Sequence, residues 1–331
     1  MTIGCITIIA LVNIRIRYEE IFGGILDIED MKALSLKGIN DNTKLGFSEK
    51  LTTNSIVRNY ENTLCNLDKQ SVTNLMSFNL SQERHLKSEN KHEEIFDFFH
   101  QFVQNPHHSF CKEIKRFGGQ FNFGCKFTDG SKFVCMDDLL QDVLNGDCLI
   151  YSFGVAEDWT FEDVMDDLGC EVYAFDGSVK YPKRRGNGIH FEQVWVSDEI
   201  IEDKNKMSFT NLLDKNGHAN AKISYLKMDI EGNELKCLPS WLESGALENV
   251  QQIGLEFHLD NQYNNYKNDL RTTVNFIDTL KKLYFHGNYR LISYEANGCA
   301  KNSETNKGRN RYFNLAEIVL KKIPHDHSCS V

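Results

Sequence analysis

The segment that decides the fold is CLIYSFGVAEDWTFEDVMDDLGCEVYAFDGS, residues 148 to 178. Leu149–Phe153 is a short, mostly apolar run typical of a buried parallel strand, and Gly154 follows it where the chain must turn. The apolar residues from Trp159 to Leu168 recur at helical spacing, and Glu171–Phe175 predicts a second strand. This order of strand, glycine turn, helix and strand is that of a Rossmann-like unit.

Asp176 ends the second strand about 22 residues after Gly154, close to the ~20-residue offset at which an acid binds ribose hydroxyls. The turn has one glycine instead of GxGxxG, so a pyrophosphate-containing cofactor such as NAD is disfavoured. S-adenosylmethionine has a ribose and no pyrophosphate. We therefore predict that it binds the residues at these two strand ends, with an ordinary α/β domain and an incidental acid as the alternative. The predicted cofactor residues are Ser152, Phe153, Gly154, Asp176 and Ser178.

The motifs YSFG, DWTFE, FDGS and LKMDIEGNE resemble those of the animal methyltransferase-like proteins around methyltransferase-like protein 24, from about Cys111 to Lys322. The MDIEG element is also similar to one in FkbM-type sugar methyltransferases. The resemblance implies an S-adenosylmethionine-dependent methyltransferase. Gly177 stands where the family pattern FDPS has proline, which we expect to loosen the loop after Asp176.

The rest of the chain supplies the other elements of a seven-stranded methyltransferase sheet. Further strands are predicted at Ile189–Val196, Ile223–Met228, Gln252–Phe257, Tyr289–Tyr294 and Phe313–Leu320, and helices at Phe209–Leu213, Asn233–Leu247 and Thr272–Tyr284. A polar loop, EANGCAKNSETNKGRNR, joins the last two strands without a helix, so they should be antiparallel. The predicted fold class is α/β and Rossmann-like, with a mostly parallel sheet and an antiparallel last strand.

Ligands of open α/β sheets bind at the carboxyl ends of the strands. Asp229 and Glu231 follow one predicted strand, and Glu256 and His258 finish the next. Methyl transfer requires donor and acceptor to be held in contact and a proton to be removed, and Asp229, Glu231 or His258 could accept it. The alternatives are helix capping for the two acids and an ordinary strand-end role for the histidine.

We assign no metal ligands, although a divalent cation on Asp229, Glu256 and His258 is a less favoured alternative. The similarity to sugar-directed enzymes implies a hydroxyl acceptor on a glycan or small molecule. The net charge of −10 argues against nucleic acid. The basic cluster of Lys180, Lys183, Arg184 and Arg185 either attracts an acidic substrate or is simply solvated. A catalytically silent fold that serves as a binding module is the alternative function.

The domain organisation is predicted from composition. Residues 1–30 contain the apolar run Ile3–Val12, which is a signal, a truncated membrane anchor or a buried strand, and membrane contact is expected only there. Residues 31–90 read as a polar stem or weakly ordered region and residues 91–331 as the methyltransferase domain. A helix at His92–Val103, with its aromatic side chains in the core, should cover an edge of the sheet, with occlusion of its cleft as the alternative.

Ten cysteines and a glycosylation acceptor at Asn79 favour the secretory pathway, either secretion or the Golgi lumen, over the cytoplasm. Cys148 and Cys170 precede neighbouring strands and form one candidate disulfide. Cys111 and Cys135 form another. In a cytoplasmic protein these four would be buried thiols.

Overall fold

The structure is a computed structural model that describes residues 72–73, 75, 89–120, 130–182, 184–201, 205–259, 266–297, 304–307, 310–313 and 315–323. The predictions for residues 1–30, and for nearly all of the polar stem, lie outside the described residues. Among those that are described, no helix is both long and apolar enough to cross a bilayer.

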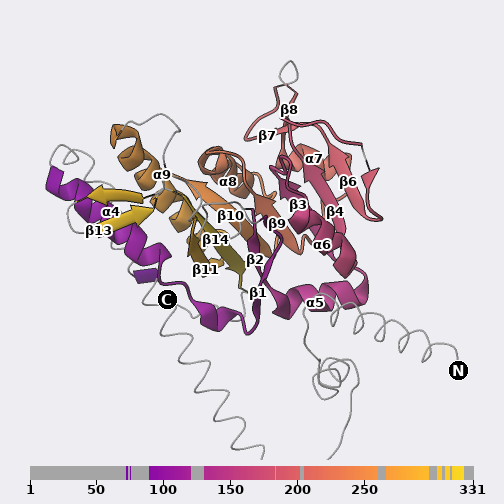
Figure 1. Ribbon diagram of the computed structural model, residues 1–331, viewed down its shortest axis with the longest axis horizontal. Coiled ribbons are helices and arrows are strands. Elements are labelled where there is room, and N and C mark those ends of the chain that lie inside the picture. Colours follow the sequence, from indigo (N-terminus) through magenta and orange to yellow (C-terminus); the bar gives the residue numbers. More distant parts are fainter. Residues whose placement is uncertain are drawn as a thin grey trace, which may run out of the picture. The chain divides into compact units, whose positions relative to one another are not determined.

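A mixed sheet of eight strands forms the centre of the molecule (Figure 1). Its order is β11 (Tyr289–Ala296), β14 (Leu315–Lys322), β10 (Gln252–His258), β9 (Tyr225–Met228), β3 (Leu149–Phe153), β4 (Glu171–Phe175), β6 (Ile189–Glu192) and β5 (Arg184–Arg185). Strands β10, β9, β3, β4 and β6 are parallel to one another, whereas β14 is antiparallel to both β10 and β11. The predicted fold class is therefore confirmed, with the two-residue β5 added antiparallel at one edge.

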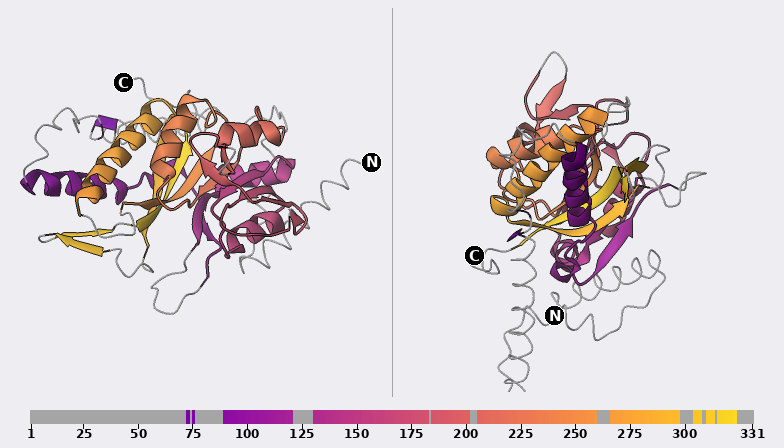
Figure 2. Two further views of the ribbon diagram at one scale, coloured as in Figure 1. Left: turned by 90° about the horizontal axis from the view of Figure 1, so that it is seen from above. Right: turned by 90° about the vertical axis from the view of Figure 1, so that its left-hand side faces the viewer.

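Helices cover both faces of this sheet because its strands carry apolar side chains on each side. The structure has α4 (Glu89–Val103), η3 (His108–Phe110), α5 (Met136–Asn145), α6 (Thr160–Leu168), α7 (Phe209–Lys215), α8 (Glu234–Glu243) and α9 (Tyr266–Phe285). Phe209 of α7 and Trp241 of α8 pack against Phe153 of β3 on one face, and Phe161 of α6 packs against Tyr225 of β9 on the other. Figure 2 shows α8 and α9 on one side of the sheet and α5 on the other.

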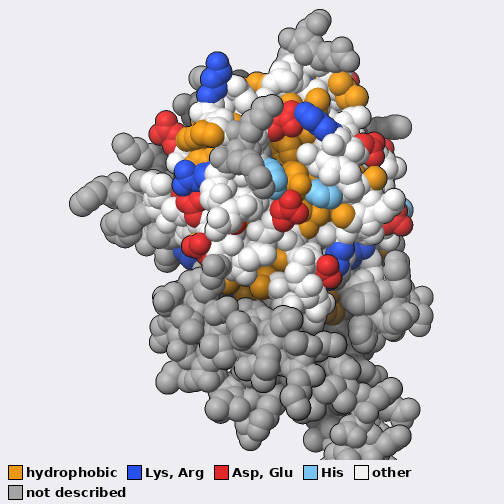
Figure 3. Space-filling model, turned by 90° about the vertical axis from the view of Figure 1, so that its right-hand side faces the viewer, with side chains coloured by type: hydrophobic (Ala, Val, Ile, Leu, Met, Phe, Trp, Pro, Cys, Tyr) orange, Lys and Arg blue, Asp and Glu red, His pale blue; other side chains and the backbone are white. Residues whose placement is uncertain are grey.

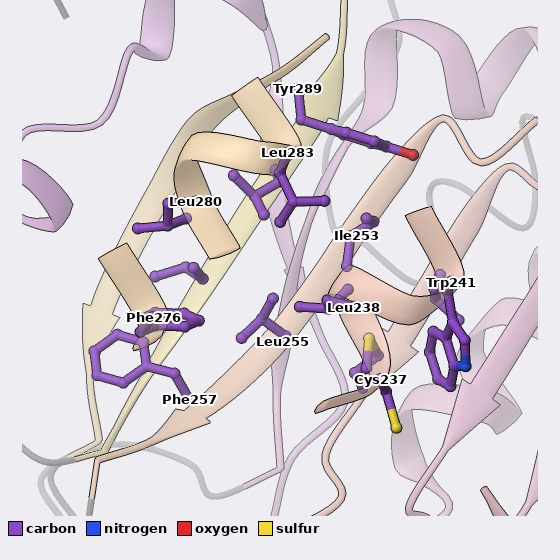
Figure 4. Packing of buried hydrophobic residues seen from close by; sticks show 14 of the residues in the cluster. Cys237, Leu238, Trp241, Ile253, Leu255, Phe257, Phe276, Leu280, Leu283 and Tyr289 are labelled. Atoms are coloured by element: carbon purple, nitrogen blue, oxygen red, sulfur yellow. The ribbon is translucent and has the colours of Figure 1, made fainter. Parts of the chain in front are cut away.

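The hydrophobic core is densest between β10, α8 and α9 (Figure 4). Leu238, Leu255 and Phe276 are buried there among the side chains drawn as sticks. Helix α4 joins this core through Phe99, whose ring meets those of Phe257 and Phe276 edge-on. The aromatic residues of the predicted helix at 92–103 are thus in the core, as expected.

A hairpin of β1 (Ile114–Phe117) and β2 (Lys132–Cys135) lies against the sheet, where the Gln252 side chain exchanges two 2.8 Å hydrogen bonds with the backbone of Cys135. Disulfides join Cys111 to Cys135 and Cys148 to Cys170, which confirms both predicted pairs. The second links the starts of β3 and β4. Disulfides of this kind persist in oxidising compartments.

Two sequence predictions were wrong in detail. The third strand ends at Glu192, and Trp195–Ser197 forms a separate strand, β7, that pairs with β8 (Lys206–Ser208) because the backbone leaves the main sheet after β6. The segment predicted as a polar loop contains a hairpin of β12 (Glu304–Lys307) and β13 (Asn310–Phe313). The polar composition did not predict this hairpin, because two polar strands joined by a two-residue connection can pair through their backbones alone.

Candidate active site

A cavity of about 500 Å³ opens at the carboxyl ends of β3, β4, β9 and β10. Its volume lies within the range of small-molecule sites. Five of the predicted site residues line it: Gly154, Asp176, Ser178, Asp229 and Glu231. The other lining residues that matter below are Asp158, Gly177, Trp195, Lys227 and Glu256. The ends of strands far apart in sequence therefore form one concave site.

Ser152 and Phe153 do not line this cavity through their side chains. Ser152 is fully buried, and its hydroxyl donates a 2.5 Å hydrogen bond to Glu162 Oε1. The ring of Phe153 lies in the core against Trp241. Side chains within a strand point to the two faces of the sheet, and only residues beyond its end face the ligand.

Gly154 brings the turn after β3 into direct contact with the turn after β9. Its φ is 79°, and a β-carbon built on it would lie 1.7 Å from the carbonyl oxygen of Asp229. The Asp229 amide also donates a 2.9 Å hydrogen bond to the carbonyl of Phe153. Glycine is required at this position for two reasons: its φ is positive, and the Asp229 backbone lies where a side chain would be.

Asp176 holds the two loops around the cavity together. Its Oδ2 accepts hydrogen bonds from the amides of Val155 (3.0 Å) and Ala156 (2.8 Å), and its Oδ1 accepts from the amide (2.7 Å) and hydroxyl (2.6 Å) of Ser178. A carboxylate offers about four acceptor positions. All four acceptor positions of Asp176 are used by hydrogen bonds within the protein. Asp176 therefore holds the glycine turn in place.

Gly177 makes room for an aromatic side chain. A β-carbon at this position would lie 2.2 Å from the indole of Trp195, which is 48% exposed and lines the cavity. The expectation that glycine merely loosens this loop was therefore wrong, because the missing side chain is replaced by the packed indole ring.

A cluster of buried charges forms the inner wall below the cavity. Lys132 is 1% exposed, and its Nζ lies 2.6 Å from Glu317 Oε1 and 3.3 Å from Asp229 Oδ2. One carboxylate oxygen each from Asp229, Glu256 and Glu317 lies within 4.8 Å of the others. The lysine thus supplies positive charge to three carboxylates that are close enough to repel one another.

These contacts shift the pKa values in opposite directions. Burial would raise the pKa of Asp229, but Lys132 and other nearby cations outweigh it and hold the pKa below its usual range. Burial, with the charges of Asp229 and Glu317, raises the pKa of Glu256 to about 9. Burial raises the pKa of Glu317 to about 7. Negative charge is therefore in excess at this wall, and Asp229 is the member that stays ionised.

His258 lies next to Glu231. Its Nε2 lies 3.6 Å from Glu231 Oε2 and 3.8 Å from Glu256 Oε2, while its Nδ1 lies 3.4 Å from Glu234 Oε1. Burial would lower the pKa of His258, but Glu234 and the other carboxylates raise it to about 9. The three residues predicted to be catalytic, Asp229, Glu231 and His258, are thus brought together, with ligand atoms within 4.8 Å of one another.

Helix capping does not account for the acids after β9. The first residue before α8 is Asn233, and no side chain caps that helix terminus. Asp229 instead pairs with Lys132. Glu234 takes the local role, because its Oε1 accepts a 2.9 Å hydrogen bond from the amide of Ile230.

The charge of the cavity wall is strongly negative. Among the described lining residues, five are acidic, Asp158, Asp176, Asp229, Glu231 and Glu256, and one is a lysine. That lysine, Lys227, is itself bound to Glu162 at 3.0 Å and to the carbonyl of Gly154 at 3.1 Å. The raised pKa of Glu256 leaves it protonated at neutral pH, so it does not add to the negative charge. The site therefore favours a cationic ligand over an anionic one.

Lys180 and Arg185 of the predicted basic cluster do not line this cavity. Arg185 forms two hydrogen bonds with Asp163, at 3.0 and 2.7 Å. Lys183 lies outside the described residues. On the face shown in Figure 3, Lys and Arg are interspersed with Asp and Glu instead of forming one basic patch.

Sequence reasoning missed Lys132, Glu234, Glu317 and Trp195. Lys132 and Trp195 carry no local signal, since their partners come from distant strands. Glu317 did carry a local signal, because it is a single acid in the apolar run LAEIVL. Burying an unpaired charge there would be costly, so the sequence implied that Glu317 has a partner in the fold.

A family model described as a methyltransferase domain matches residues 65–307, about three quarters of the chain. The probable methyltransferase-like protein 24 of Homo sapiens is 32% identical over 143 residues, which cover 38% of this chain and 37% of that protein. The protein of the same name from Rattus norvegicus is 31% identical over 143 residues, 38% of each chain. The chain thus spans less than two fifths of these curated relatives. The resemblance predicted from the sequence motifs is confirmed.

Among solved structures, a chain in the crystal structure of a fibrillarin/NOP5p complex matches 64% of this chain and 92% of its own length, with 12% identity and a TM-score of 0.34.

Proposed function

The chain belongs to the methyltransferase domain family, and we propose that it binds S-adenosylmethionine in the cavity at the ends of β3, β4, β9 and β10 and transfers a methyl group to a hydroxyl acceptor. The observation that carries this proposal is the charge of the cavity wall. The sulfonium and ammonium groups of S-adenosylmethionine suit the carboxylates of Asp158, Asp176, Asp229 and Glu231. The pyrophosphate of NAD would face the same carboxylates with one lysine that is already paired, so a nicotinamide cofactor is disfavoured.

The residues of the chain fit the cofactor at two ends of the cavity. The indole of Trp195 and the loop that carries Gly177 and Ser178 offer a surface for the adenosine part. Asp229 and Glu231 offer negative charge for the cationic part. When bound, S-adenosylmethionine supplies an electrophilic methyl carbon.

The remaining chemistry belongs to the side chains at the wall. The acceptor oxygen must approach the methyl carbon in line with the carbon–sulfur bond, whose electron pair returns to sulfur as the new carbon–oxygen bond forms. The acceptor proton passes to a wall carboxylate, from Asp229 or Glu231. Lys132 keeps Asp229 ionised and therefore able to take part.

The acceptor class rests on analogy with the sugar-directed enzymes that share the MDIEG element, so a glycan or small hydroxyl compound is proposed. The two disulfides support a location in the secretory pathway, where glycans are abundant acceptors. Nucleic acid is not proposed as a substrate, because phosphates would meet the same acidic wall.

Calorimetric titration of the full chain with S-adenosylmethionine, S-adenosylhomocysteine and NAD tests the cofactor. We expect saturable binding of the first two and none of NAD. Asp229→Asn should weaken binding of S-adenosylmethionine about tenfold, equivalent to about 1.4 kcal/mol, and weaken S-adenosylhomocysteine less, because that product lacks the sulfonium. Asp138→Asn is the matched control, since Asp138 is 47% exposed and pairs with Lys321 outside the cavity. Equal effects of Asp229→Asn on both ligands would contradict the charge argument.

One observation favours a catalytically silent binding module as a second candidate. Both oxygens of Asp176 are already occupied by hydrogen bonds within the protein, which leaves them no free acceptor position for ribose hydroxyls. Incubation with S-adenosylmethionine and a panel of glycans distinguishes the two candidates. Release of S-adenosylhomocysteine that depends on the acceptor supports the enzyme, and binding without release supports the module.

A further inference from the structure

His258 has the environment of a metal-binding histidine. Its side chain is 10% exposed, and Glu234, itself 1% exposed, lies against Nδ1. Metal-bound histidines commonly present one nitrogen to the ion while a carboxylate orients the ring through the other. In this protein Nε2 is the nitrogen that faces the carboxylates of the cavity wall.

His258 Nε2 is too far from the neighbouring carboxylate oxygens for hydrogen bonds, but the distances suit atoms that bind the same metal ion. Glu231 Oε2 and Glu256 Oε2 lie 3.6 and 3.8 Å away. Two ligand atoms that each bind one cation at about 2.1 Å can be at most about 4.2 Å apart, so both separations allow a common ion. Asp229 forms a set with Glu231 and His258 whose ligand atoms lie within 4.8 Å of one another, so a shift of at most about 0.6 Å would bring all three within reach of one ion.

A second observation is a buried carboxylate oxygen at this wall that lacks a hydrogen-bond partner. Glu317 is 7% exposed, and its Oε2 has no hydrogen-bond partner among the described residues, although one of its oxygens belongs to the cluster with Asp229 and Glu256. Among the described residues, Lys132, Lys227 and His258 supply the positive charge that acts on the acids of this wall. A buried carboxylate oxygen without a partner is unfavourable, and a cation at this wall would offset that cost.

We propose that Asp229, Glu231 and His258 bind a divalent cation of the Mg²⁺ and Mn²⁺ class at the cavity wall, with Glu234 as the positioning residue that orients the His258 ring. Two carboxylates and one imidazole match Mn²⁺ well, since carboxylates suit Mg²⁺ and Mn²⁺ and no thiolate is present in the set to favour zinc or copper. The role of the ion rests on the proposed function: it would hold the acceptor oxygen beside the methyl donor. Glu256 stays outside this ligand set.

Calorimetric titration of the full chain with Mn²⁺, after treatment with a chelator and removal of the chelator, tests the site. We expect one saturable Mn²⁺ site that Glu231→Gln and Glu234→Gln each weaken at least tenfold. Glu231 is 68% exposed, so its variant should fold normally. Glu243→Gln on α8 is the matched control, because Glu243 is 71% exposed and pairs with Lys282 away from the cluster.

Two results would overturn the proposal: no saturable Mn²⁺ binding at millimolar concentrations, or binding to Glu231→Gln as tight as to the wild type. A folded Glu231→Gln variant, verified by its circular dichroism, makes the second result decisive even if Glu234→Gln fails to fold. The titration contains no S-adenosylmethionine. Mn²⁺ binding without cofactor binding would refute the proposed function alone, whereas cofactor binding in chelator without any Mn²⁺ binding would refute the cation site alone.

Discussion

The indole of Trp195 occupies the space that a side chain on Gly177 would need, with the built β-carbon 2.2 Å from the ring. Gly177 follows Asp176 just after the end of β4, and Trp195 begins β7, so the contact joins the loop after β4 to the start of β7 at the wall of the cavity. The glycine in FDGS is therefore explained by a residue 18 positions later in the chain.

Gly177→Ala should reshape this wall. The backbone of Gly177 is not in the left-handed region, so the cost comes from displacing Trp195 and should be about 1 to 3 kcal/mol of unfolding free energy. Urea denaturation measures it. In a Trp195→Ala background the same substitution should cost almost nothing, and an equal cost in both backgrounds would show that the two residues are not coupled.

Gly154→Ala should be much more damaging than Gly146→Ala. Both glycines have nearly the same φ, 79° and 78°, but a β-carbon on Gly146 would meet nothing within 4 Å, whereas on Gly154 it would meet the Asp229 backbone. The control thus carries only the backbone penalty, about 1 to 2 kcal/mol. We expect Gly154→Ala to lower the melting temperature several degrees further and to abolish S-adenosylmethionine binding. Similar melting temperatures for the two variants would refute the steric account.

Lys132→Met should destabilise the fold by about 3 to 5 kcal/mol, because it leaves buried carboxylates without their cation. Adding Glu317→Gln should restore part of that loss, as measured by urea denaturation in a double-mutant cycle. Lys222→Met is the control. Lys222 also pairs with an acid, Asp142 at 2.6 Å, but it is 46% exposed, so about 0 to 1 kcal/mol is expected. If Lys132→Met lowered the free energy of unfolding by as little as Lys222→Met, the role of Lys132 as the cation of this cluster would be contradicted.

His218 should make stability depend on pH. Burial lowers its pKa, Glu171 raises it by a smaller amount and His190 lowers it further, and its Nδ1 lies 2.9 Å from the Tyr151 hydroxyl. The unfolded chain therefore binds this proton more readily than the folded one, so the contribution is fully present above the unfolded pKa of about 6.5 and is lost as the pH falls toward the folded pKa.

Urea denaturation from pH 7.5 downward measures this effect. His218→Gln should flatten the fall in unfolding free energy below about pH 6.5, while His286→Gln, at an exposed histidine, controls for the loss of a ring. An unchanged slope in His218→Gln would show that another group is responsible.

Much of the fold could be predicted because its signals are local. The strands at 149–153 and 171–175 were found at their observed bounds, since apolar runs and a glycine turn are properties of adjacent residues. The third strand and the hairpin at 304–313 were harder. Their bounds depend on where the backbone leaves the sheet and on pairing between polar strands, which hydrophobic periodicity does not report.

The sequence by itself determined the fold class, the strands at 149–153 and 171–175 and the strand ends that carry acids, and it indicated Cys111–Cys135 and Cys148–Cys170 as candidate disulfides. These inferences follow from spacing along the chain. Only the tertiary structure decided that those cysteines pair, that Lys132 and Glu317 join Asp229, that Glu234 lies 3.4 Å from His258 Nδ1 and that Trp195 fills the space beside Gly177. Charge interactions and steric exclusion act through space over a few ångströms, so partners separated by up to 185 residues become neighbours only when the sheet is assembled.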